Sequence, residues 1–190
     1  MEIDLTMLPR GTAMTLPYAE PLTRLTPGPR VIPEPPRVGE PGGAPCGLCA
    51  WIADPAASGH EPPLWQNDDW VLCRATEVTI PGIVWLTTRE HHDSFADLPD
   101  RVAAGYGGVV ARIERAILAL GDIARVHVYR WGDGSSHFHI WFYPRPLGML
   151  EARREMLPLW ADLMPAAPAA VAAEAEQKIA AALRAGDPQT

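Results

Sequence analysis

Hydrophobic residues follow two different periods in the middle of the chain, and these periods predict several strands and one long helix. Runs of β-branched and aromatic residues between turn signals predict four strands, at 69–74, 83–88, 124–130 and 137–143. Between the second and third strands, apolar residues recur every three or four positions up to Gly121, which indicates an amphipathic helix. Ser94 and Asp97 have the spacing of a capping box, so we expect this helix to begin there. The pattern is typical of an α+β fold in which one helix face covers a sheet.

The connections between these elements divide the chain into three parts. Residues 131–136 are too few for a crossover helix, so the last two strands should form an antiparallel hairpin. Ten prolines lie between Pro9 and Pro45, a density that disfavours both helix and sheet. We therefore expect a proline-rich extended or disordered arm over 1–43, an α+β domain over 44–148 and a C-terminal helical extension over 149–190. The extension is predicted to hold a helix near 149–164, a proline break, and an alanine-rich helix that stops at Gly186.

Charge and composition exclude several classes of partner. The chain of 190 residues carries a formal net charge of -7, so neither nucleic acid nor an anionic membrane surface would be attracted to its average field. It has no run of 18 apolar residues, and its first residues lack the basic and apolar regions of a secretion signal, which makes the cytoplasm the expected location. Lys178 is the only lysine, so we expect neither a P-loop nor a Schiff-base lysine. Any phosphate group must therefore meet arginine, backbone amides or imidazole.

Two histidines in the last predicted strand are candidates for chemistry. His137 and His139 are two positions apart, so both rings should lie on one face of the strand, roughly 6–7 Å from each other. Trp141 is the next residue on that face. At this separation the two imidazoles can share a site and still take different roles. The alternative is a half-buried strand whose histidines only cap a polar pocket.

Two of the three cysteines form the motif Cys46-x-x-Cys49, whose spacing indicates a metal or redox site rather than a disulfide framework. The redox alternative is weaker because no strand followed by a helix starting at the motif is evident. A tetrahedral metal site needs two more ligands, for which His91 or His92 and His137 are the candidates. Such a structural zinc site has no open position, so chemistry would fall to the second histidine of the strand.

In this order, the motifs resemble the histidine triad (HIT) superfamily over about residues 44–148. The elements that carry the resemblance are Cys46-x-x-Cys49, Asp68-Asp69 before a strand, Arg89-Glu90-His91 after the next strand, the acidic-leucine segment 94–98, the long helix, and the run 137–145. The chain is similar to the zinc-bearing branch and looks like HIT-like proteins of actinobacteria, to judge by 130–134 and 159–162. The resemblance implies an antiparallel meander sheet with a long packed helix, and a homodimer such as family members commonly form.

The resemblance also implies a role for each candidate residue. His139 matches the nucleophile that takes up a nucleoside phosphate as a covalent intermediate, so a nucleotide or a phosphorylated small molecule is the expected partner. His137 matches a metal ligand of the zinc-bearing relatives, together with the cysteine motif and His91. The remaining candidates are Ser135 and Ser136 for contacting an oxygen or protonating a leaving group, and Arg130, Trp131 and Trp141 for contacting the substrate.

Two positions depart from the HIT pattern. Trp141 stands at the third triad position, where hydrolases of the family have histidine and transferases have glutamine. Asp133 stands where glutamine is often found, and its charge opposes a phosphate unless a cation such as Arg130 offsets it. Two hypotheses follow. One is a nucleotidyl hydrolase or transferase that acts through a nucleotidyl-histidine on His139; the other is a HIT-fold protein that binds a nucleotide or partner, or carries out non-nucleotide chemistry, through the same pocket.

Overall fold

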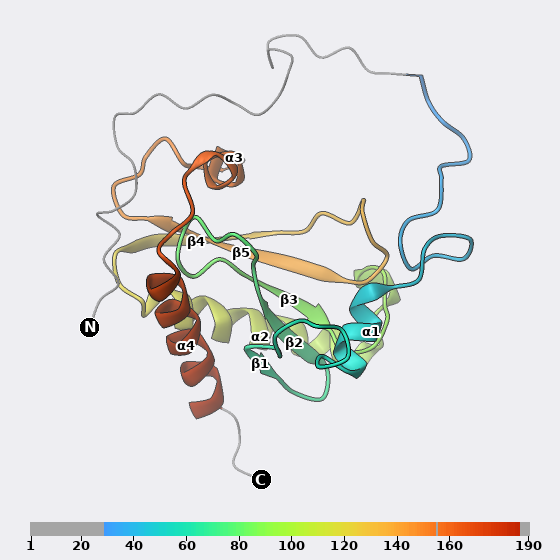
Figure 1. Cartoon of the computed structure of the whole chain (residues 1–190), viewed down its shortest axis with the longest axis horizontal. Helices are drawn as coiled ribbons and strands as arrows, with labels where there is room; N and C mark the ends of the chain where they lie inside the picture. Colours follow the sequence, from blue (N-terminus) through green and yellow to red (C-terminus); the bar gives the residue numbers. More distant parts are fainter. Residues whose placement is uncertain (1–28, 155, 187–190) are drawn as a thin grey trace.

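One antiparallel sheet forms the centre of the protein. The computed structural model describes residues 29–154 and 156–186, and within them the sheet has five strands in the order β1-β2-β3-β5-β4 (Figure 1). The strands are β1 (Trp65–Gln66), β2 (Trp70–Arg74), β3 (Val84–Thr88), β4 (Ile123–Tyr129) and β5 (His139–Pro146). The α+β class predicted from the sequence is confirmed, and the four predicted strands correspond to β2 through β5.

The position of β5 departs from a meander in strict chain order. β4 and β5 form the predicted antiparallel hairpin, in which Tyr129 lies opposite Trp141. β5 also pairs with β3, where Thr87 lies opposite His139. β4 is therefore at the edge of the sheet, and β5 lies inside it with a neighbour on each side. His139, the first residue of β5, is consequently held by strand pairing from β3.

The long helix α2 (Asp100–Leu118) covers one face of the sheet with the apolar stripe that the sequence predicts. Its buried residues are Val102, Val109, Ile113, Ala116 and Ile117. The predicted start at a capping box is wrong. A 3-10 turn, η1 (Phe95–Asp97), comes first; the Ser94 side chain caps nothing, and the Asp97 carboxylate accepts from the Asp93 N–H instead, at 2.8 Å. Pro99 explains the break, because a residue that precedes proline is pushed out of the helical region, and Leu98 is extended.

Two further helices follow the sheet in the described part of the chain. α3 (Met156–Leu163) contacts β5 on the face opposite α2, and α4 (Ala169–Ala185) packs against α2 and β1 (Figure 1). The two predicted helices of the extension are thus present, the second one ending at Gly186 as expected. No helix in 29–154 or 156–186 is long and apolar enough to cross a membrane.

A helix that the sequence analysis missed begins at the cysteine motif. α1 (Gly47–Ala53) has Cys46 as its N-cap, and the Cys46 thiol accepts a hydrogen bond from the Cys49 N–H at 3.5 Å. The helix is only 7 residues long and has no acidic residue in its first turn, so the usual signals of a helix start are absent. Its first turn presents both thiols to one site.

Candidate metal centre and adjoining pocket

Cys46, Cys49, His91 and His137 come together at the start of β5. One ligand atom of each lies within 4.8 Å of all the others. The Nδ1 atom of His137 is 3.4 Å from the Cys46 Sγ and 3.3 Å from the Cys49 Sγ, and Nδ1 of His91 is 3.2 Å from the Cys49 Sγ. A tetrahedron with ordinary zinc–sulfur and zinc–nitrogen bonds has edges of roughly 3.5 Å. Two thiols and two imidazoles in this arrangement could hold one tetrahedral metal ion.

The outer nitrogen of each imidazole has a partner that turns Nδ1 toward the thiols. His137 is fully buried, and its Nε2–H donates to the Thr88 carbonyl at 2.9 Å. His91 places Nε2 at 3.3 Å from the hydroxyl of Ser136, whose own proton goes to the Val38 carbonyl at 3.2 Å. Hydrogen bonds of this kind fix the tautomer of metal-binding histidines. Both rings are therefore oriented as ligands.

Burial disfavours the charged forms of two of the cluster's side chains. Burial, followed by the hydrogen bond and charge of Cys46, raises the pKa of the Cys49 thiol to about 11. Burial also lowers the pKa of His137, although its bond to Thr88 acts in the opposite sense, and a lowered pKa favours the neutral imidazole. A neutral imidazole is a metal ligand, and a divalent ion would displace the proton of each thiol.

His139 lies next to this centre but has different partners. Its Nδ1–H donates to the His137 carbonyl at 2.8 Å, which leaves Nε2 with a free lone pair. The ring meets Trp85 edge-on, with centroids 6.5 Å apart. It lines a cavity of about 410 Å³, and the other side chains that matter in its wall are Trp51, His60, Arg74, Trp85, Ser135 and Trp141.

Comparisons with known proteins agree with this architecture. A Zn-bound histidine triad family protein from Mycobacterium smegmatis matches with a TM-score of 0.53 and 18% identity, over 73% of this chain and 92% of that one. A hypothetical histidine triad nucleotide-binding protein from Sulfolobus tokodaii matches with a TM-score of 0.50 and 10% identity, over 74% and 93%. The chain has the histidine triad (HIT) fold.

A uridylyltransferase mutant has the same fold with a TM-score of 0.50 and 17% identity, over 74% of this chain but only 47% of that protein. No family model matches the chain, and no curated protein matches it. The predicted HIT resemblance is confirmed at the level of the fold. The resemblance to proteins of actinobacteria stays a prediction.

The HIT fold brings some predicted site residues to the cavity and places others elsewhere. Ser135 and Trp141 line the cavity with His139. Ser136 is buried between His91 and Val38 and does not line it. Arg130 donates to the Asp93 carbonyl at 2.7 Å, and Trp131 stacks on Tyr129 with ring centroids 5.1 Å apart. Neither of these two side chains reaches the cavity wall.

His92, the alternative metal ligand, lies in a different place. Its Nε2 atom is buried without a hydrogen-bond partner in the described residues, 3.9 Å from a carboxylate oxygen of Glu90. It lines a small recess together with Asp69 and Thr88. His91, and not His92, therefore belongs to the cysteine–histidine cluster.

Four side chains of the cavity were missed by the sequence analysis. Trp85 lies directly opposite Trp141 in the β3–β5 pairing, and the two rings are 5.9 Å apart. Arg74 ends β2, while Trp51 and His60 come from α1 and the loop that follows it. Only the pairing of β3 with β5 makes Trp85 and Trp141 neighbours, and no local pattern in the sequence reports that pairing.

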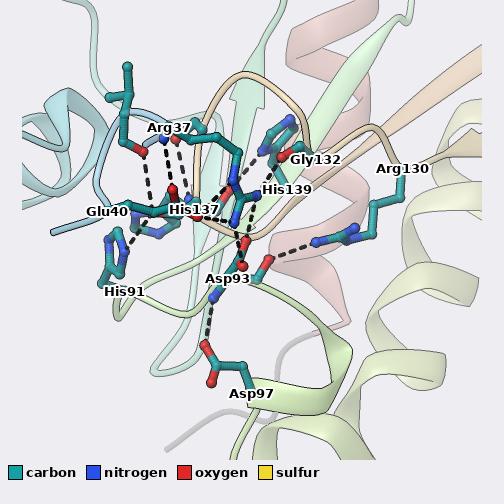
Figure 2. A network of polar contacts seen from close by, with 12 residues as sticks. Arg37, Glu40, His91, Asp93, Asp97, Arg130, Gly132, His137 and His139 are labelled. Carbon is teal, nitrogen blue, oxygen red and sulfur yellow. Dashed lines mark hydrogen bonds and ion pairs between the residues drawn. The ribbon is translucent and has the colours of Figure 1, made fainter. Parts of the chain in front are cut away.

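An arginine of the proline-rich segment was also missed. Arg37 binds the Asp93 carboxylate through two nitrogens, at 3.0 and 2.7 Å, and binds Glu40 and the Gly132 carbonyl as well (Figure 2). The hydrogen bonds from Arg37 are the main reason that the pKa of Asp93 lies below its usual range. Residue 37 thus contacts the segments on both sides of the metal centre. It belongs to the arm predicted over 1–43, of which residues 1–28 lie outside the described residues.

Proposed function

We propose that this protein is a nucleotidyl hydrolase or transferase that acts through a covalent nucleotidyl-histidine on His139. The observation that carries this proposal is the bond from Nδ1 of His139 to the His137 carbonyl, because it leaves the Nε2 lone pair free at the cavity. Attack of Nε2 on a phosphorus forms a P–N bond and breaks the bond to the leaving group, which takes up a proton. Water or another acceptor then attacks the same phosphorus, so that a P–O bond forms, the P–N bond breaks, the attacking group gives up its proton, and His139 is released.

The other groups of the cavity suit a nucleotide or a phosphorylated small molecule. Trp51 and Trp85 offer aromatic surfaces on which a base can stack, and Ser135 is the candidate to protonate the leaving group. The indole N–H of Trp141 makes no hydrogen bond within the described part of the chain, so it can donate to a phosphate oxygen. Arg130, Trp131 and Ser136 stay predicted contacts, although they do not line the cavity.

We further propose that Cys46, Cys49, His91 and His137 hold a structural zinc ion. Two thiolates and two neutral imidazoles are a usual zinc ligand set, and four protein ligands leave no open position. When bound, the ion supplies rigidity and no reacting group. This rigidity matters for His139, because the carbonyl of the ligand His137 accepts the hydrogen bond that orients the His139 ring.

A second function is favoured by the surroundings of Trp141 and Arg74. Indole is larger than histidine or glutamine, and Arg74 already pairs with Glu61 at 3.1 Å and with Glu176 at 3.4 Å. A guanidinium shared by two carboxylates attracts a phosphate less strongly. These contacts favour binding of a nucleotide or partner without turnover, or chemistry on a substrate that is not a nucleotide.

One experiment separates the two functions. The protein is incubated with nucleotidyl phosphoramidates, dinucleoside polyphosphates and nucleotide sugars, and its intact mass and the products are measured. We expect turnover and an adduct of one nucleotidyl group that a His139→Asn variant loses. The matched control is His127→Asn, which changes a half-buried histidine of β4 outside the cavity and should keep both signals. Binding without turnover or adduct would support the second function.

Two further expectations belong to this proposal. A cytoplasmic location fits three free cysteines, which a reducing compartment would preserve. Among the described residues, the edge strand β4 pairs only with β5, so its other edge is available for pairing with a second copy of the chain. Measuring the mass of the protein in solution checks whether it forms a homodimer.

A further inference from the structure

The guanidinium of Arg37 uses its whole set of donors within one small region. Nε and Nη2 bind Glu40, Nη1 and Nη2 bind the two oxygens of Asp93, and Nη1 also binds the Gly132 carbonyl at 2.6 Å (Figure 2). These bonds account for all five N–H groups of an arginine side chain. Two carboxylates surround one guanidinium, and they hold the pKa of Arg37 above its usual range. A side chain so fully engaged is fixed in one position.

The partners of Arg37 belong to the three segments that carry the metal ligands. Arg37 itself precedes the cysteine motif, and a backbone hydrogen bond of 2.8 Å between Gly39 and Ala44 closes the turn in between. Asp93 lies two residues after His91, and Gly132 lies five residues before His137. The arginine therefore joins, through hydrogen bonds and two ion pairs, chain segments up to 95 residues apart.

The two residues after Arg37 lie against Ser136, the hydrogen-bond partner of the ligand His91. The Val38 carbonyl accepts from both the backbone N–H and the hydroxyl of Ser136, at 2.9 and 3.2 Å, and the same hydroxyl holds His91. Gly39 has a φ of +92°, and a Cβ built on it would lie 2.7 Å from the Ser136 hydroxyl and 2.9 Å from the His91 ring. Only glycine allows the backbone to approach this closely.

From these contacts we infer that residues 37–39 position the metal centre, with Arg37 fixing the three ligand-bearing segments and Val38 and Gly39 fixing the ring of His91 through Ser136. This inference rests on the metal centre of the proposed function and adds a role for residues outside the ligand set. Arg37 touches neither the ligands nor the cavity, so it is a positioning residue. Loss of a direct hydrogen-bond partner of a ligand, such as Ser136, lowers metal affinity about 10- to 100-fold, and Arg37 lies one contact further from the ligands.

The test measures zinc affinity in the full-length protein by competition with a chromophoric chelator. Arg37→Met should weaken zinc binding about 10-fold, the lower end of the range for direct partners, because Arg37 contacts no ligand. Arg37→Lys should recover part of the loss, because it keeps the charge but not the planar fork. Arg30→Met is the matched control, since Arg30 is an exposed arginine of the same segment. The cobalt-loaded protein provides a second measurement, because its visible absorption reports the geometry of the ligands; Arg37→Met should alter it and Arg30→Met should not.

Gly39→Ala supplies an independent variant in case Arg37→Met does not fold. Its methyl group pushes on the Ser136 hydroxyl and the His91 ring, so it should weaken zinc and alter the cobalt spectrum while the ligands and Arg37 stay intact. The inference would be overturned if a folded Arg37→Met variant kept the zinc affinity and the cobalt spectrum of the wild type. If Arg37→Met does not fold, the same result in Gly39→Ala would overturn it. Failure of the wild-type protein itself to bind zinc is a different result, because it would overturn the metal centre proposed above.

Discussion

His139 donates its Nδ1–H to the main-chain carbonyl of His137 at 2.8 Å. One residue is a candidate metal ligand and the other a candidate nucleophile, so this single bond couples the two sites. The His137 ring is itself held by Thr88 of the neighbouring strand β3. A change at the metal centre should therefore reach the chemistry through the position of one carbonyl oxygen.

Removal of the metal should cost considerable stability. Zinc present at about 1,000 times its Kd stabilises a protein by about 4 kcal/mol, which is roughly 8–16 °C in Tm for a chain of this length. We expect a chelator to lower the Tm by this amount, and we expect Cys46→Ser to contain little zinc and to unfold at the lower temperature. Cys73→Ser is the control: its thiol is buried in β2 outside the cluster, so zinc content should not change. Scanning calorimetry and elemental analysis check these expectations.

Two variants of Trp141 should separate the roles of its ring and its N–H group. Trp141→Phe keeps an aromatic face and removes the donor, so it should lower kcat about 10- to 100-fold with little change in KM. Trp141→Gln keeps a donor and removes the face, so it should mainly raise KM. Steady-state kinetics on a substrate found by the adduct experiment provide the measurement. Equal kinetics in Trp141→Phe and the wild type would show that the indole N–H contributes nothing to the transition state.

Two glycines should respond to the same substitution in opposite directions. Gly82 has a φ of +90°, and a Cβ there would lie 2.8 Å from Leu120, so Gly82→Ala should destabilise the fold by about 1–3 kcal/mol. Gly107 lies in α2, where a Cβ would meet nothing within 4 Å. Gly107→Ala should therefore stabilise the fold by about 0.5–1 kcal/mol. Urea denaturation measures both changes, and the same sign for both would contradict this interpretation.

The stability should fall at high pH partly because of Tyr143. Burial, with smaller effects from Asp162 and Tyr129, raises the pKa of Tyr143 to about 12, against about 10 for an unfolded chain. The folded state keeps this proton after the unfolded state has lost it, so the contribution is complete below about pH 10 and is lost as the pH rises toward 12. One such proton changes the free energy of unfolding by about 1.4 kcal/mol per pH unit. Urea unfolding from pH 9 to 12 should show a shallower fall for Tyr143→Phe than for the wild type.

Local patterns were sufficient for most elements of the fold. The strands, the hairpin and the stripe of α2 follow from periods of two and of three to four residues, and His137 and His139 lie in one short run. The prediction of the helix start was wrong for a local reason too, because Pro99 keeps Leu98 out of the helical region despite the Ser94–Asp97 spacing. These parts of the structure depend on residues near one another in the chain.

Contacts between distant segments could not be predicted in the same way. Arg37 binds Asp93 at a separation of 56 residues. No pattern in a proline-rich sequence indicates which arginine pairs with which aspartate. The insertion of β5 between β3 and β4 likewise depends on packing of the whole sheet, and it alone makes Trp85 and Trp141 neighbours. The cysteine and histidine motifs indicated the metal cluster; the residues that surround it carry no comparable signal.

Cys49 and His137, which meet in the cluster, are separated by 88 residues. At a synthesis rate of about 5–20 residues per second, the ribosome needs about 4 to 18 s to add the histidine after the cysteine. His91 follows Cys49 after 42 residues, so for the rest of that interval the nascent chain carries two thiols and only one of their two imidazole partners. With the metal centre proposed above, both thiols lack their complete ligand set until the last strand of the sheet has been made, and a thiol without its metal is open to oxidation or to capture of a foreign metal.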